Sequence, residues 1–221
     1  MTPRPRWISI GEIALFYGLA EWIIWFGGAY RPTILVVAVI IIGLCIASNQ
    51  YHGDSRERIG LGKGTFWPAL KLALPITLPF ALPLIILALV RESFAAWNWK
   101  FSFFGYPFWG FAQEYALLGF LANRWEDGLP GRAKLIPWLN GLLFSLAHAP
   151  NPVLMTVTFV SGVLFTALFF RRRNLLAYAL LHAVFGILIN LAFGHIHGIM
   201  SVGTSYTRRI GNPYKVVDPR N

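Results

Sequence analysis

Charged residues and cysteine are both scarce in this chain. Only 13% of its 221 residues are charged, whereas 56% are hydrophobic, and an ordinary soluble domain has about 25% charged residues. The single cysteine, Cys45, lies within an apolar run, which excludes an intramolecular disulfide and a cysteine-based metal cluster. The chain also lacks an evident internal repeat or low-complexity tract. This composition excludes an ordinary soluble domain and indicates a membrane protein.

The hydrophobic residues occur in blocks of about 17 to 22, each long enough to cross a hydrocarbon core of about 30 Å as a helix. We therefore predict an all-α, polytopic transmembrane bundle with about seven spans. One membrane domain is expected over residues 1–193 and a polar tail over residues 194–221. The expected spans cover residues 8–30, 32–48, 67–90, 104–121, 135–149, 153–170 and 175–193.

The start of the chain does not read as a cleavable signal peptide. The first apolar run carries Glu12 and Glu21, and no small-residue cleavage site follows it. We expect this run to stay attached as the first span.

The positively charged residues are concentrated in the expected loops. The formal net charge is +10, but Lys and Arg fall mostly between apolar blocks and form no basic face, so we expect no nucleic-acid partner. Their excess in alternate loops predicts a multi-pass protein of the plasma (cell inner) membrane with a cytoplasmic N-terminus. The basic tail residues would lie outside on a count of seven, so either the count is wrong by one or the tail re-enters.

Three ionisable residues lie in the fourth, fifth and seventh expected spans: Glu114, His148 and His182. A charged side chain at the centre of a membrane helix costs roughly 2.5 to 3.5 kcal/mol, so such residues usually serve a function. We predict that all three converge on one site. The alternative is that each one only hydrogen-bonds a neighbouring helix.

A carboxylate and two imidazoles in a water-containing cavity can make water nucleophilic and stabilise an oxyanion, as peptide-bond hydrolysis requires. The same set, Glu114, His148 and His182, could instead bind a divalent metal such as zinc and leave a fourth position open. The short run 135–149 ends at Pro150, which would leave His148 beside a cavity. His195 and His197 also suggest metal ligands, but they follow the last expected span.

The order of polar motifs resembles one known family. Gln113-Glu114 is followed by Gly119, then by Phe144-Ser-Leu-Ala-His148, and later by His182-Ala. This order is similar to that of the CPBP family of intramembrane proteases, over about residues 56–190. That family includes the type II CAAX prenyl endopeptidases and the bacteriocin-processing and immunity (Abi) proteins. The resemblance implies a helical membrane protease, with membrane lipid and a membrane-associated or lipidated peptide as partners.

The chain departs from the family pattern in two of three motifs. The family motifs are Glu-Glu-x-x-x-Arg, Phe-x-x-x-His and His-x-x-x-Asn or Asp, and only the second is complete here. Gln113 replaces the Glu that activates water in the family, and Leu118 stands where the Arg is expected. Gly186 stands where the Asn is expected, and Asn190 lies one helical turn further on, as a candidate for contacting the substrate or the oxyanion.

The leading hypothesis is therefore a membrane-embedded endopeptidase that hydrolyses a peptide bond of a membrane-associated or lipidated substrate. Glu114 would act as base in place of Gln113, His148 would orient the water and His182 would assist at the oxyanion. Alternatively, Glu12 or Glu21 reaches the cavity from the first span.

Two other classes remain open. One is a non-catalytic relative that binds a peptide or acts in bacteriocin immunity. The other is a small transporter or channel, which is least favoured because no inverted repeat is visible.

Overall fold

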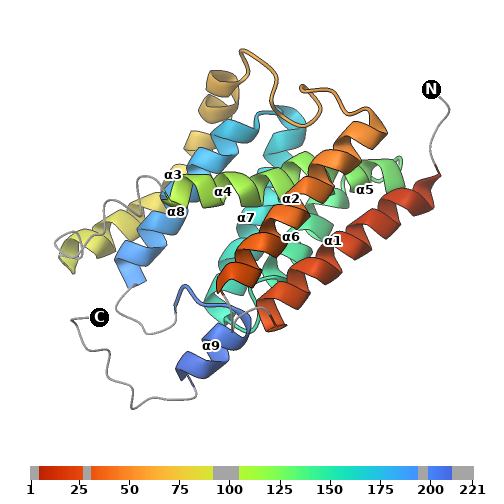
Figure 1. Ribbon diagram of the computed structural model, residues 1–221. Helices are drawn as coiled ribbons and strands as arrows, with labels where there is room; N and C mark the ends of the chain where they lie inside the picture. Colours follow the sequence, from red (N-terminus) through yellow and green to blue (C-terminus); the bar gives the residue numbers. More distant parts are fainter. Residues whose placement is uncertain (1–4, 27–30, 92–104, 194–198, 211–221) are drawn as a thin grey trace.

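The computed structural model describes residues 5–26, 31–91, 105–193 and 199–210, and these residues form helices and turns without a strand. The prediction of an all-α fold is confirmed. The helices, drawn in Figure 1, are α1 Arg6–Phe26, α2 Arg31–His52, α3 Phe66–Val90, α4 Tyr106–Glu114, the π-helix η4 Tyr115–Leu121, α5 Ala122–Gly128, α6 Ile136–Leu146, α7 Pro152–Arg171, α8 Leu175–Phe193 and α9 Gly203–Ile210.

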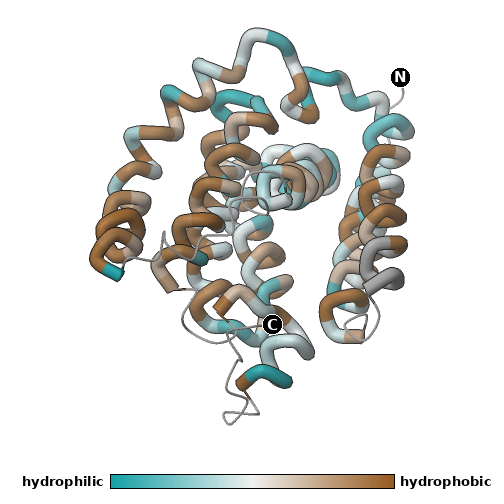
Figure 2. The backbone as a smooth tube through the Cα atoms, turned by 60° about the vertical axis from the view of Figure 1, so that its left-hand side comes forward, coloured by the Kyte–Doolittle hydropathy of each residue, from teal (hydrophilic) through white to brown (hydrophobic). Residues whose placement is uncertain are grey.

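Four of the described helices, α1, α3, α7 and α8, are long and apolar enough to cross a membrane, and two shorter apolar helices cover Ala38–His52 and Ile136–Leu146. The outer helix faces expose large apolar side chains such as Trp7, Phe26 and Val90. Figure 2 shows this apolar character along the helices, with hydrophilic segments gathered mainly at turns and ends. A surface of this kind suits lipid. The protein is thus a helical membrane protein, and the count of seven spans stays a prediction.

The stretch between the expected spans 104–121 and 135–149, which we took for a loop, is helical in its first half. The chain remains helical through α5, so α4, η4 and α5 form one nearly continuous segment across the middle of the molecule (Figure 1). Charged residues suggested a solvated loop, but Asn123 and Arg124 are fully buried. The helix can continue because their polar groups find partners within the protein. Likewise, the expected polar tail contains α9.

Helices α6 and α7 approach closely where two glycines face each other. A Cβ added to Gly162 would lie 2.9 Å from the Cα of Gly141, so neither position leaves room for a side chain. Next to this crossing, Asn140 donates from Nδ2 to the Leu117 carbonyl oxygen at 2.9 Å and to the Thr166 hydroxyl at 3.1 Å. Small residues permit close packing of membrane helices, and such polar contacts add to it. Together they fix α6, which leads to His148.

Buried and half-buried charged side chains gather at one end of the bundle, where the loop after α2, helix α5 and the α7–α8 turn meet. We call this group the ionic cluster; it consists of Asp54, Arg58, Arg124, Glu126, Asp127 and Arg173. Arg124 contacts Asp54 directly, and its Nη1 donates to Asp127 Oδ2 at 3.1 Å. Arg58 donates to Asp54 and to Asp127, both at 2.6 Å.

The α7–α8 turn joins the ionic cluster through Arg173. Its guanidinium donates to Glu126 Oε2 at 3.0 Å and to Asn123 Oδ1 at 2.7 Å. Burial lowers the pKa of Arg58, but the hydrogen bond to Asp127 and the neighbouring carboxylates outweigh it and raise the pKa above its ordinary value. The cluster therefore holds the loop, α5 and the turn together by charge-assisted contacts.

Candidate active site

Glu114 is the last residue of α4, and the π-helix η4 begins directly after it. π-helical turns are rare and often occur at functional sites. Because a π-turn holds more residues than an α-turn, it changes the direction of the side chains that follow. No residue pattern in the Tyr-Ala-Leu-Leu-Gly-Phe-Leu stretch signals this irregularity, and the sequence analysis missed it.

The structure brings Glu114 and His182 together. Glu114 Oε1 lies 2.7 Å from Nδ1 of His182, although the two residues are 68 positions apart and belong to α4 and α8. The carboxylate is fully buried, whereas the imidazole is 14% exposed. With Glu114 ionised, the Nδ1–H of His182 donates this bond, which fixes the tautomer and leaves a lone pair on Nε2.

His148 lies in the turn that follows α6, as the short helix suggested. Its Nδ1 contacts the Phe144 carbonyl oxygen at 2.7 Å. Since a carbonyl oxygen only accepts, Nδ1 carries the proton and Nε2 of the neutral ring is again an acceptor. The Phe144 ring lies near both imidazoles, with centroid distances of 4.9 Å to His148 and 5.9 Å to His182. Phe144 thus links the two histidines sterically.

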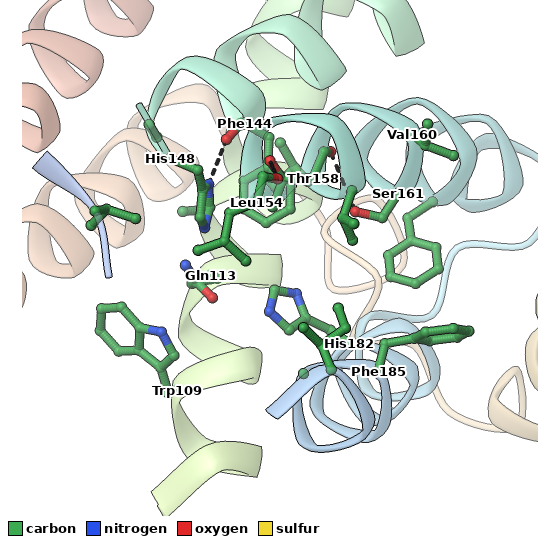
Figure 3. A pocket seen from close by; sticks show the side chains of 18 of the residues that line it. Trp109, Gln113, Phe144, His148, Leu154, Thr158, Val160, Ser161, His182 and Phe185 are labelled. Atoms are coloured by element: carbon green, nitrogen blue, oxygen red, sulfur yellow. Dashed lines mark hydrogen bonds between the residues drawn. The ribbon is translucent and has the colours of Figure 1, made fainter. Parts of the chain in front are cut away.

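The two histidines and Gln113 line one cavity of about 820 Å³ whose walls are mainly apolar. Figure 3 shows their side chains directed into the same space, from α4, from the turn after α6 and from α8. Glu114 does not line this cavity, although its neighbour Gln113 does. An imidazole that faces a cavity and is hydrogen-bonded to a carboxylate behind it has the arrangement of a general base oriented by a carboxylate.

The remaining predicted residues lie elsewhere. Asn190 is exposed and is not among the described residues that line the cavity. Glu12 contacts His52 at 3.0 Å, near the ionic cluster, and Glu21 accepts a hydrogen bond from Trp25 Nε1 at 3.0 Å. Neither glutamate belongs to the described cavity wall. His195 and His197 fall outside the described residues.

Two departures from the family pattern have local consequences. Leu118 is fully buried where the family has an Arg and offers no donor, and Glu114 Oε2 has no hydrogen-bond partner among the described residues. Gly186 lies against Tyr106, a cavity residue that the sequence analysis missed. Only the fold reveals this contact, because Tyr106 and Gly186 are far apart in sequence.

Metal binding by Glu114, His148 and His182 stays a prediction from the sequence. No group of three or more His, Cys, Asp or Glu side chains within the described parts of the chain is placed to hold an ion. His182 Nδ1 and Glu114 Oε1 contact each other directly, and His148 Nδ1 contacts the backbone. The contact between Glu114 and His182 gives an imidazole that is oriented by a carboxylate.

Comparison with known proteins identifies one family. Residues 94–188 match the family model of the type II CAAX prenyl endopeptidase Rce1-like proteins. Comparisons with curated proteins and with solved structures give no significant match. The matched segment contains Gln113, Glu114, His148 and His182 but not Asn190. The match covers less than half of the chain and agrees with the resemblance to the CPBP family that the motifs carry.

Proposed function

We propose that this protein is a membrane-embedded endopeptidase that hydrolyses a peptide bond in a membrane-associated or lipidated substrate. The observation that carries the proposal is the hydrogen bond between the fully buried Glu114 and His182, at the wall of a large apolar cavity. A buried ionisable pair at membrane depth is costly unless it serves a function, and the match to a protease family points to the kind of function.

In the proposed reaction, His182 is the base and Glu114 acts through it. Nε2 of His182 takes a proton from water while the water oxygen bonds to the carbonyl carbon, and the carbonyl electron pair moves to oxygen. The C–N bond then breaks, and the imidazolium returns its proton to the leaving nitrogen, which yields a carboxylic acid and an amine. Glu114 stabilises the imidazolium and holds its tautomer.

His148 and Gln113 have supporting roles in this scheme. Nε2 of His148 accepts a hydrogen bond from the attacking water and so orients it. Gln113 cannot accept a proton as a carboxylate would, but its amide can donate to the substrate or position water. This assignment places Glu114 one step further from the water than the sequence analysis expected, because the carboxylate does not line the described cavity.

Reconstituted protein in lipid vesicles offers the direct test. Quenched fluorescent peptides, with and without a lipid at the C-terminus, would be incubated with the wild type, with His182→Ala and with His148→Ala, and new chain ends would be identified by mass spectrometry. We expect cleavage that falls by about a thousandfold or more in His182→Ala. Lys71→Ala, an exposed position on α3, serves as control. Equal cleavage by His182→Ala would contradict the proposal.

One observation favours a second function. Gln113 lines the cavity where the family carries its water-activating Glu, which suits a non-catalytic protein that binds a peptide or acts in immunity. Such a protein would bind a lipidated peptide without cutting it, in the wild type and in both histidine variants alike.

A further inference from the structure

The side-chain space at position 186 is occupied by Tyr106. A Cβ added to Gly186 would lie 2.2 Å from Cε1, 2.5 Å from the hydroxyl oxygen and 2.6 Å from Cζ of Tyr106. All three distances are far below a van der Waals contact, so any side chain at 186 requires the phenol to move. Tyr106, near the start of α4, and Gly186 on α8 therefore form a matched pair.

This pair lies in the same cavity as the histidines. Tyr106, His182 and Gly186 all line its wall. Gly186 follows His182 by four residues on α8, and Cβ positions at that spacing are about 5 to 6 Å apart. Because the Tyr106 hydroxyl takes up the Cβ region of Gly186, it lies about one helical turn from the proposed base. The hydroxyl and the proposed base thus belong to neighbouring parts of the same cavity wall.

The reaction needs a donor that the histidines do not supply. With Glu114 ionised, both imidazoles direct Nδ1–H toward protein oxygens, at 2.7 Å each, so Nε2 of each neutral ring can only accept. An oxyanion that forms during attack is stabilised by hydrogen-bond donors fixed in advance. Gln113 can provide one N–H donor. A phenolic O–H packed against α8 is a second donor of suitable chemistry.

We propose that Tyr106 is a catalytic residue whose hydroxyl donates a hydrogen bond to the carbonyl oxygen of the scissile bond as that oxygen gains negative charge. The inference rests on the proposed endopeptidase function. It also explains how the chain accommodates glycine at 186, where the resembling family has Asn: the phenol enters from α4 and occupies the space that the missing side chain leaves.

The first test removes only the hydroxyl. Tyr106→Phe should lower kcat by about a hundredfold or more with little change in KM, because the lost contact forms mainly in the transition state. Tyr178→Phe is the matched control, since this tyrosine is also buried on the bundle interior but its hydroxyl donates to the Arg172 carbonyl oxygen, away from the described cavity. Wild-type kcat in Tyr106→Phe, or a loss confined to KM, would overturn the inference.

A second test exchanges the two side chains. Gly186→Ala should displace the phenol and lower kcat as Tyr106→Phe does. Tyr106→Ala should also be impaired, and adding Gly186→Asn to it should restore kcat by about tenfold or more, because the amide donor then has room. Failure of the double variant to exceed Tyr106→Ala, when both fold as judged by unfolding temperature, counts against a donor at this place.

A spectroscopic measurement separates this inference from the proposed function. A peptide ketone with a ¹³C-labelled carbonyl would be bound to the wild type and to Tyr106→Phe, and the infrared carbonyl stretch compared. We expect a lower frequency in the wild type, since a hydrogen bond weakens the C=O bond. An equal frequency in both proteins, or no binding of the ketone, overturns the role of Tyr106. Absence of cleavage by the wild type together with the expected shift overturns the peptidase and leaves Tyr106 as a donor to a bound carbonyl.

Discussion

Two carboxylates in this bundle, Asp54 in the ionic cluster and Glu114 behind the cavity, have side chains that are fully hidden from solvent. Asp54 contacts two guanidinium groups, those of Arg58 and Arg124. Glu114 contacts one imidazole, and its second oxygen has no partner among the described residues. A carboxylate thus has two cationic partners in the ionic cluster, whereas beside the cavity only one of its oxygens is paired.

The difference distinguishes a structural role for Asp54 from a chemical role for Glu114. The two arginines that contact Asp54 stay protonated, so this pairing does not change during a reaction. The ionic cluster therefore has a structural role, which is to hold the loop after α2, helix α5 and the α7–α8 turn together. An imidazole, unlike a guanidinium, can take a proton from water and return it during a reaction. The Glu114–His182 pair beside the cavity can therefore take part in proton transfer. Its incomplete pairing suits a reactive site rather than a structural contact.

The largest expected effect follows from breaking the ionic cluster. Arg124→Leu removes the fully buried one of the two guanidinium groups that contact Asp54. It also removes the donor to the Asn49 side-chain oxygen, which accepts from Arg124 at 3.0 Å. Removing one partner of a buried ion pair costs about 3 to 5 kcal/mol. Unfolding in detergent, followed by circular dichroism, should show a large drop in stability. Arg132→Leu is the control because Arg132 is exposed. Equal stabilities would show that the cluster does not fasten this end of the bundle.

Glu114→Gln should lower activity and leave stability almost unchanged. The amide fills the same volume and can still hydrogen-bond His182, so the unfolding temperature should change little. It cannot stabilise the imidazolium, however, and kcat should fall by about a hundred- to a thousandfold, or about 3 to 4 kcal/mol of barrier. Peptide cleavage by vesicle-reconstituted protein measures this effect. A large loss of stability with unchanged kcat would show that Glu114, like Asp54, has a structural role.

The contrast between the two regions also marks what sequence can reveal. The apolar blocks predicted the helical bundle, and the cost of ionisable groups in lipid singled out Glu114, His148 and His182. The pairing of Arg124 with Asp54 was hidden because charged residues near Gly and Pro resemble a solvated loop. The π-helix at Tyr115–Leu121 and the contact of Tyr106 with Gly186 depend on how distant helices pack, and no local pattern encodes either feature.

A smaller effect is expected from Gln113→Glu, which restores the carboxylate that the family carries. The side chain lines the cavity, so a carboxylate there can accept a proton from water directly. We expect kcat to rise by about tenfold, toward the lower range for general-base catalysis. Gln113→Leu, which removes the amide without adding a base, should not share the gain. A fall in kcat for both variants would show that the amide itself is required as a donor.

The smallest effect is expected at Asn190, where family spacing and geometry disagree. Its side chain is exposed and lies off the described cavity wall, unlike Gly186 one turn earlier. Asn190→Ala should change stability by no more than about 0.5 kcal/mol, as surface substitutions usually do, and should leave kcat and KM unchanged. A fall in kcat comparable to that of Tyr106→Phe would mean that Asn190 reaches the substrate when it binds. The oxyanion donor would then have to be assigned to α8 rather than to α4.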